Sequence, residues 1–226
     1  MAENKDKKPS IWSKYTDEDK KNLEELNKNY IDFMSVCKTE RESVEFAITE
    51  AEKCGYKNLR DVISNRQRLN AGDKVYYSFM NKSLVMFQIG SEPIQNGLKI
   101  LGAHIDTCRL DVKQNPLYDD GGLAYLDTHY YGGIKKYQWV TLPLAMHGVV
   151  VKKDGTTIKI NIGENPEDPV FCVTDLLIHL AQEQMKKDAS KVVEGENLDI
   201  LVGNYPIKED KDKESVKEGV LKILKE

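Results

Sequence analysis

A histidine and an aspartate with the chemistry of a metal site stand two residues apart in this sequence, at His104 and Asp106. They lie at the end of an apolar stretch, 98–105, whose residues favour a β-strand. Side chains along a strand alternate between its faces, so we expect both polar groups on one side. A neutral imidazole binds zinc well, and a neighbouring carboxylate fixes its tautomer. Taken alone, the pair also fits a structural histidine held by a hydrogen bond.

Three longer motifs surround this pair in the sequence. They read Gly-Ala-His-Ile-Asp-Thr at 102–107, Tyr-Tyr-Gly-Gly-Ile-Lys-Lys-Tyr-Gln-Trp at 130–139 and Pro-Leu-Ala-Met-His-Gly-Val-Val at 143–150. With these motifs the chain closely resembles the aspartyl aminopeptidase and vacuolar aminopeptidase I family of dinuclear zinc exopeptidases, and most of all its bacterial branch. The resemblance runs from about Trp12 to the end of the chain.

The resemblance implies roles for three residues and shows one departure from the family pattern. His104 matches a histidine that binds one zinc ion, and Asp106 matches the aspartate that supports this ligand. Cys108 stands where many relatives carry proline, and we expect it to change local packing rather than to bind metal. His179 matches a histidine on a helix that reaches the active site of a neighbouring subunit. From the residues alone, the favoured interpretation of His179 is an exposed helix histidine without a role.

The activity implied by the resemblance is that of a zinc-dependent aminopeptidase, which removes N-terminal residues from peptides. A complete active site of this kind holds two Zn²⁺ ions. The resemblance also implies a homo-oligomer, in which dimers assemble into a dodecamer.

A two-metal site needs more than one histidine. It requires a bridging carboxylate, further ligands and a glutamate as general base. In the family these residues come from the second half of the catalytic domain, and no matching Glu-Glu pair, bridging aspartate or final histidine motif occurs in this sequence. We therefore interpret the chain as incomplete and inactive alone. The alternatives are half of a split enzyme, or a non-catalytic oligomerisation or assembly protein derived from this family.

The helices and strands that must position these residues can be predicted from sequence patterns, and together they indicate an α/β chain. Capping signals at Thr16 and Thr39 predict two helices, the first with a buried apolar face. Strand-forming residues separated by turn residues predict two hairpins. Apolar spacing predicts two later helices. The ranges are, in chain order, 16–34, 39–55, the hairpins 75–89 and 148–163, a helix from Thr174 and a helix from Val216.

The resemblance divides the chain into three parts. Residues 1–106 would form the N-terminal part of a zinc-exopeptidase catalytic domain. Residues 107–204 would form an inserted, mainly β dimerisation domain. Residues 205–226 would form a charged linker and the start of a helix that returns to the catalytic half.

Composition narrows the class of protein. The formal charge of −4 argues against a dedicated nucleic-acid binder, and no apolar run approaches the length of a membrane span. The polar N-terminus has no apolar signal region behind it, and the four cysteines form no C-x-x-C pair. We therefore expect a soluble, cytoplasmic protein with reduced thiols and no nucleic-acid or membrane partner.

Overall fold

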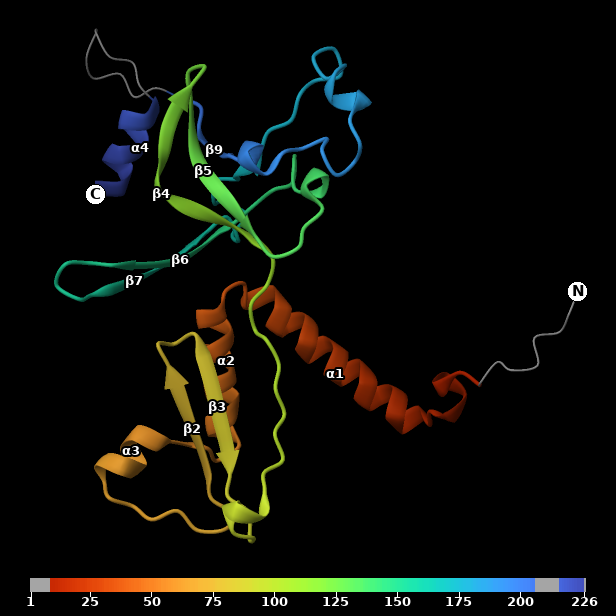
Figure 1. The fold of residues 1–226 in the computed structure, drawn as a ribbon, viewed down its shortest axis with the longest axis vertical. Coiled ribbons are helices and arrows are strands. Elements are labelled where there is room, and N and C mark those ends of the chain that lie inside the picture. The colour runs from red at the N-terminus through yellow and green to blue at the C-terminus, as the bar shows by residue number, and fades with distance from the viewer. Residues whose placement is uncertain (1–8, 206–215, 226) are drawn as a thin grey trace, which may run out of the picture. The chain divides into compact units, whose positions relative to one another are not determined.

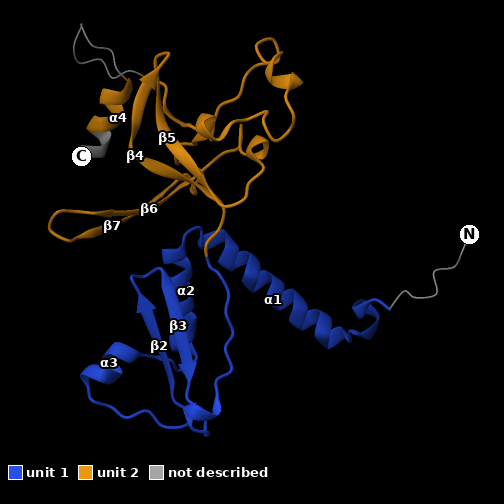
Figure 2. Ribbon diagram, viewed as in Figure 1, with its two compact units in different colours: residues 1–105 blue, residues 106–226 orange. Residues whose placement is uncertain are grey.

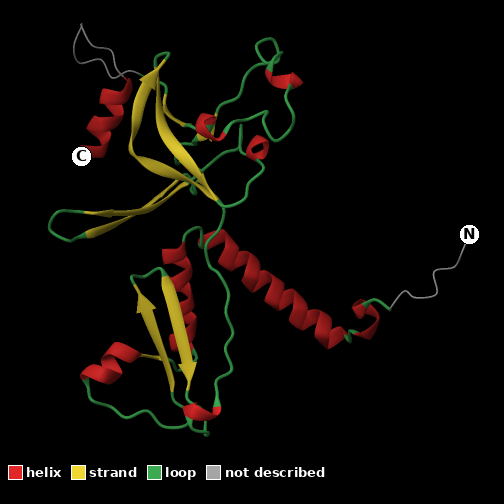
Figure 3. Cartoon of the chain, viewed as in Figure 1, coloured by secondary structure: helices red, strands yellow, loops and turns green. Residues whose placement is uncertain are grey.

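The computed structural model describes residues 9–205 and 216–225, and it combines helices with antiparallel and parallel strands (Figure 3). The chain forms two compact units, residues 1–105 and residues 106–226 (Figure 2). Most of the charged stretch expected to act as a linker, 206–215, falls outside the described residues. No helix of the described ranges is long and apolar enough to cross a membrane.

Two capped helices open the first unit, as predicted. Helix α1 (Asp17–Val36) follows the short 3₁₀ helix η1 (Ile11–Lys14), and α2 (Glu40–Lys53) follows directly after. Each begins with a reciprocal capping box, formed by Thr16 with Asp19 and by Thr39 with Glu42. The chain leaves α2 through Gly55, whose φ of 84° is the left-handed conformation that glycine adopts readily.

The apolar face of α1 is exposed, so the prediction of a buried face is wrong. Leu26 and Tyr30 are 66% and 59% exposed, and no residue of the helix is fully buried. The helix extends away from the sheet of its own unit (Figure 1), so its apolar side has no second layer to pack against. An edge-to-face contact of 5.1 Å between the ring centroids of Phe33 and Phe46 ties its C-terminal end to α2.

A small sheet completes the first unit. Its order is β1 (Lys57–Asn58), β2 (Lys74–Phe79) and β3 (Ser83–Gln88), with α3 (Leu59–Ser64) between β1 and β2. Strands β2 and β3 pair antiparallel, which confirms the first predicted hairpin. The buried core of this unit draws on α2, α3 and β2, and consists mainly of Val44, Ala51, Val62, Val75 and Tyr76.

The third strand expected in the first unit, 98–105, is absent. The chain makes a 3₁₀ turn, η2 (Ile94–Asn96), and then runs without strand pairing to residue 108. Ile100 and Leu101 are 82% and 100% exposed. A strand is stable only when its backbone groups bond to a neighbour, and in the part of the chain that the structure describes this sheet ends at β3.

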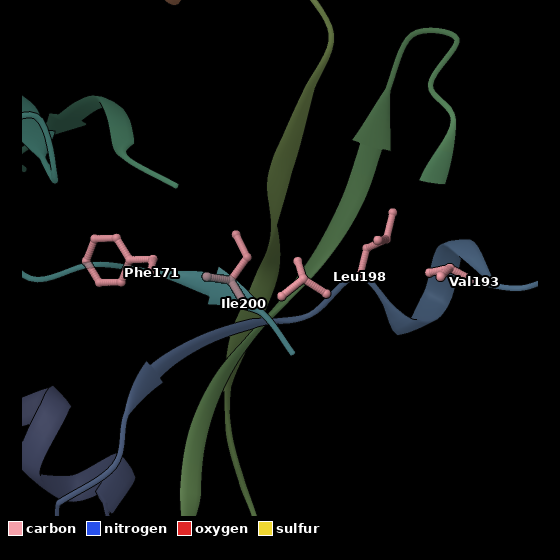
Figure 4. Packing of buried hydrophobic residues seen from close by; sticks show 5 residues of the cluster. Phe171, Val193, Leu198 and Ile200 are labelled. Atoms are coloured by element: carbon pink, nitrogen blue, oxygen red, sulfur yellow. The ribbon is translucent and has the colours of Figure 1, made fainter. Parts of the chain in front are cut away.

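The second unit is built on a long antiparallel pair, β4 (Arg109–Asp120) and β5 (Leu123–Tyr131). Strands β9 (Ile200–Gly203) and β8 (Cys172–Val173) extend it in the order β4-β5-β9-β8. A core cluster lies against this sheet (Figure 4) and consists of Phe171, Val173, Val193, Leu198 and Ile200. Three short 3₁₀ turns lie in the connections, η3 (Lys136–Gln138), η4 (Gln184–Lys186) and η5 (Gly195–Asn197).

The second predicted hairpin and the last predicted helix are both present in this unit. Strands β6 (Met146–Val151) and β7 (Thr157–Ile162) pair antiparallel, and their turn contains Gly155 with φ of 87°. Helix α4 (Val216–Lys225) packs closely on the sheet. A Cβ atom added at Gly203 of β9 would come within 2.8 Å of Val216, so glycine permits this close approach.

A half-buried carboxylate ties three parts of the second unit together. Asp199 accepts a hydrogen bond of 2.6 Å from the hydroxyl of Tyr118 on β4 and one of 3.2 Å from the backbone N–H of Thr128 on β5. The Thr128 hydroxyl bonds the carbonyl of Leu198. Burial, together with the bond to Asp199, raises the pKa of Tyr118, so this hydroxyl stays a donor at neutral pH.

Replacing this carboxylate tests its structural role. Asp199→Ala leaves the Tyr118 hydroxyl and the Thr128 N–H without their acceptor. We expect the free energy of unfolding of the second unit to fall by about 1–3 kcal/mol. Urea unfolding in a Trp12→Phe background, followed by the fluorescence of Trp139, measures this unit. The control Asp188→Ala removes an exposed carboxylate and should change stability by less than about 0.5 kcal/mol; equal losses in both variants would contradict the role assigned to Asp199.

Candidate functional site

His104 lies in the segment 97–108 that precedes β4 and belongs to no strand. It is exposed, and the strand that was expected to present it does not form. The strand rule that placed His104 and Asp106 on one side therefore does not apply in this structure. The expected strand is missing because the segment has no hydrogen-bonded neighbour among the described residues. The two residues remain joined by a single intervening residue, Ile105.

Asp106 is anchored by a side chain from the far end of β5. The hydroxyl of Tyr131 donates a hydrogen bond of 2.7 Å to Oδ2 of Asp106. Tyr131 pairs directly with Arg109 across the two strands, and the Arg109 guanidinium lies 4.1 Å from the centre of the tyrosine ring. Nε of Arg109 bonds Oδ1 of Asp111 at 2.7 Å. These contacts connect Asp106 to the first residues of the β4–β5 pair.

The sequence marked 130–139 as a family motif but gave Tyr131 no role of its own. The bond to Asp106 spans 25 positions, so no local spacing rule could have found it. The available signal was the concentration of aromatic residues and glycines in the motif, together with the pairing of residue 131 with the first residue of β4.

Cys108 packs against the same motif. Its thiol is exposed, with Sγ 3.7 Å from the carbonyl oxygen of Gly133. A Cβ atom built on Gly132 would lie 3.0 Å from this Sγ, and Gly132 has a φ of 81°. The chain therefore turns away from β5 at a position where glycine is required by both space and backbone conformation.

His179 lies in a turn at residues 178–180, and the helix expected from Thr174 is absent. The sequence has helical apolar spacing, but most of a helix's stability in proteins comes from packing its apolar face. That face is unpacked here, since Leu177 is 72% exposed. The carboxylate of Asp175 also bonds the backbone N–H of Leu176 at 2.8 Å and the Gln184 side chain at 2.9 Å, which fixes a different local conformation.

The other two histidines each contact one neighbouring side chain, and His129 is exposed. The ring of His129 stacks on Tyr130 with centroids 5.2 Å apart. His147 lies on β6, and its Nε2 is 2.9 Å from Oε1 of Glu164.

The described residues do not form a metal site by themselves. Imidazole and carboxylate are suitable donors for zinc, but a zinc site needs at least three protein ligands. Across residues 9–205 and 216–225, no three His, Cys, Asp or Glu side chains are grouped so that they could hold an ion. The arrangement can therefore present one imidazole and one anchored carboxylate, and the other ligands of a zinc centre would have to come from elsewhere.

Comparison with known proteins identifies a family for this chain. Residues 33–226 match the family model described as aminopeptidase I zinc metalloprotease (M18). The chain is 56% identical over 217 residues to a probable M18 family aminopeptidase 1 of Clostridium acetobutylicum, and the match covers 96% of this chain and 47% of that protein.

Solved structures give the same result. A crystal structure of an M18 family aminopeptidase from Thermotoga maritima matches with a TM-score of 0.86 and 40% identity, covering 97% of this chain and 46% of the other. The aminopeptidase I of Clostridium acetobutylicum matches with a TM-score of 0.82 and 52% identity, covering 96% and 47%. The chain thus spans about half the length of the relatives it matches.

Gly132 offers a test of the tight packing beside Asp106. In Gly132→Ala the new methyl group meets the Cys108 sulfur and the backbone keeps a strained positive φ, so we expect a loss of about 1–2 kcal/mol in the free energy of unfolding. Gly133→Ala is the matched control, because a Cβ there meets nothing within 4 Å and its φ is not positive. Denaturant unfolding of both variants measures the difference.

Combining Gly132→Ala with Cys108→Ala separates the two causes. Removing the sulfur should restore the part of the loss that is due to contact and leave the part that is due to φ. A Gly132→Ala protein as stable as the Gly133→Ala protein would contradict the packing described here.

Proposed function

Because this chain belongs to the aminopeptidase I zinc metalloprotease (M18) family, we propose that it forms part of a zinc-dependent aminopeptidase that removes N-terminal residues from peptides. The observation that carries the proposal is the family match over residues 33–226, together with a relative of 56% identity that bears the aminopeptidase name. The sheet-anchored carboxylate of Asp106, two residues from His104, supports it from the structure.

Each site residue receives a role in this proposal. His104 is a ligand of one zinc ion, and Asp106 is the carboxylate that orients its imidazole. The complete site holds two Zn²⁺ ions. One imidazole does not make a zinc centre, so the remaining ligands and the general base come from residues that the described part of the chain does not contain.

The chain is therefore proposed to supply about half of a catalytic assembly. Residues 1–106 would belong to the catalytic domain, residues 107–204 to an inserted, mainly β dimerisation domain, and residues 205–226 to the connection back. Two observations support the proposal that another half completes the assembly. The chain spans 47% of its Clostridium relative. An apolar stretch that includes Ile100 and Leu101 is exposed where a strand was expected. A second polypeptide segment that pairs with this stretch would bury it.

Assembly and location follow from the same resemblance. We propose that the chain forms homo-oligomers, with dimers assembling into a dodecamer, and that His179 reaches the active site of a neighbouring subunit. Exposed apolar side chains around His179, such as Leu177 and Ile178, suit burial at such a contact. The four free cysteines suit a reducing, cytoplasmic environment.

A non-catalytic assembly protein of the same family is the second candidate. It is favoured by one observation, namely that the described residues hold no group of three metal-binding side chains. The two candidates differ in what happens when the other half is supplied. A half-enzyme gains metal and activity, whereas an assembly protein gains neither.

Supplying the other half tests the aminopeptidase proposal. The 226-residue chain is assayed alone and mixed with a polypeptide equivalent to the remainder of the Clostridium acetobutylicum relative, using aminoacyl substrates and zinc analysis. Alone it should hydrolyse nothing and hold no tightly bound zinc. The pair should hold two zinc ions per pair of polypeptides and hydrolyse the substrates, because the missing ligands are then present.

The control for this experiment is a matched histidine. His104→Ala should remove zinc and activity from the pair, whereas His129→Ala replaces an exposed histidine that stacks on a tyrosine and should change neither. Two bound zinc ions and hydrolysis by the chain alone would show that it is not half of a site. A zinc-free, inactive pair would favour the assembly protein.

The role of His179 is tested in the same reconstituted pair. His179→Ala should lower kcat about 100-fold, the loss expected when a group that positions substrate is removed, and should leave zinc content unchanged. Zinc analysis and steady-state kinetics measure both quantities, with His129→Ala again as the control. Unchanged turnover with normal zinc content would exclude a part for His179 in the neighbouring active site.

A further inference from the structure

The hydrogen bond between Tyr131 and Asp106 links the start of the β4–β5 sheet to the segment that carries His104. We propose that Tyr131 is a positioning residue, which holds the Asp106 carboxylate in a fixed orientation before any metal binds. The proposal rests on the proposed function, because Asp106 is taken to orient His104. It extends that function by giving the 130–139 motif a part in the site, through the bond of 2.7 Å from the Tyr131 hydroxyl.

Tyr131 is held rigidly enough to act in this way. It is the last residue of β5 and pairs with Arg109, the first residue of β4. The Arg109 guanidinium lies 4.1 Å from the centre of the tyrosine ring, and Asp111 in turn bonds Nε of that arginine at 2.7 Å. Ring stacking and backbone pairing together restrict both the plane of the ring and the direction of its hydroxyl.

The segment that carries Asp106 has no strand pairing in the described structure, so a side-chain hydrogen bond matters for its position. No strand pairing includes residues 97–108 in the described structure, so no ladder of backbone hydrogen bonds holds this segment in place. A side-chain bond to an ordered sheet is then an effective way to fix the carboxylate. A carboxylate can accept about four hydrogen bonds, so the bond from Tyr131 leaves capacity for one from an imidazole N–H.

The backbone beside this bond is also closely packed. The chain turns at Gly132, directly after Tyr131, and the Cys108 sulfur fills the space that a side chain at Gly132 would need. Cys108 stands two residues after Asp106, so the chain segments that carry the donor and the acceptor touch each other. A shift of one segment would shift the other.

Tyr131→Phe removes the hydroxyl and keeps the ring that stacks under Arg109. In the reconstituted pair, we expect this variant to lower zinc affinity about tenfold. Losses of this size are typical when a residue that orients a metal ligand through hydrogen bonds is removed. Competition with a chromophoric chelator measures the affinity. Tyr130→Phe is the matched control, because it removes a hydroxyl from the neighbouring residue and should leave the affinity unchanged.

A double-mutant cycle distinguishes positioning from a general structural role. If Tyr131 acts through Asp106, Tyr131→Phe should lower zinc affinity no further in an Asp106→Ala background. An equal loss in both backgrounds, or no loss in the natural background, would overturn the proposal.

A measurement on the metal-free 226-residue chain keeps the inference separate from the proposed function. The carboxyl ¹³C resonance of Asp106 should move in Tyr131→Phe and stay in place in Tyr130→Phe. An unmoved resonance would overturn the positioning role whatever the activity of the protein. If the resonance moves but His104→Ala leaves zinc affinity unchanged in the pair, the failure lies with the assigned metal site, and the affinity arm of the proposal is overturned with it.

Discussion

The antiparallel pairing of β4 with β5 is the constraint on which the second unit depends. Its register places Arg109 opposite Tyr131 at one end and Asp120 opposite Leu123 at the other. One end carries the contact to Asp106, and the other carries the contact from Tyr118 to Asp199. At the far end the backbone N–H of Lys217 on α4 bonds Asp119 at 2.7 Å. The register shifts between Val112 and Leu117, so the stretch 109–112 sets the contact to Asp106 and the stretch 117–120 sets the contacts to Asp199 and α4. A slip of one residue in either stretch would turn its side chains to the opposite face.

Features that depend on a few neighbouring residues were predictable from the sequence. The capping boxes at Thr16 and Thr39, the left-handed Gly55 and the Asp-Gly turn of the β6–β7 hairpin all occur as expected. In each case the stabilising groups lie within about four positions of each other, so the sequence itself contains both partners. Apolar spacing also predicted a helix from Val216, and α4 is described over Val216–Lys225, where the sheet of the second unit supplies the surface that the pattern requires.

The three wrong predictions have one physical cause. The apolar face of α1, the strand at 98–105 and the helix around His179 were each inferred from apolar patterns that require a partner surface. In each case the side chains that should be buried are exposed, as at Leu26, Leu101 and Leu177. An apolar pattern of this kind indicates that a face of the element is buried, but it does not indicate which other surface packs against that face. That the family relatives are about twice as long as this chain agrees with partners that lie outside the described residues.

In the candidate site, too, residues that are close in sequence were predicted and a distant contact was not. His104 and Asp106 were found because they are close in sequence and carry recognisable chemistry, whereas Tyr131 was missed because its contact spans 25 positions. A ligand can be recognised by its residue type, but the group that orients it is defined only by strand register. Since Arg109 and Tyr131 are paired by the β4–β5 register, a change in this pairing would move the anchor of Asp106 without altering any residue of the metal motif.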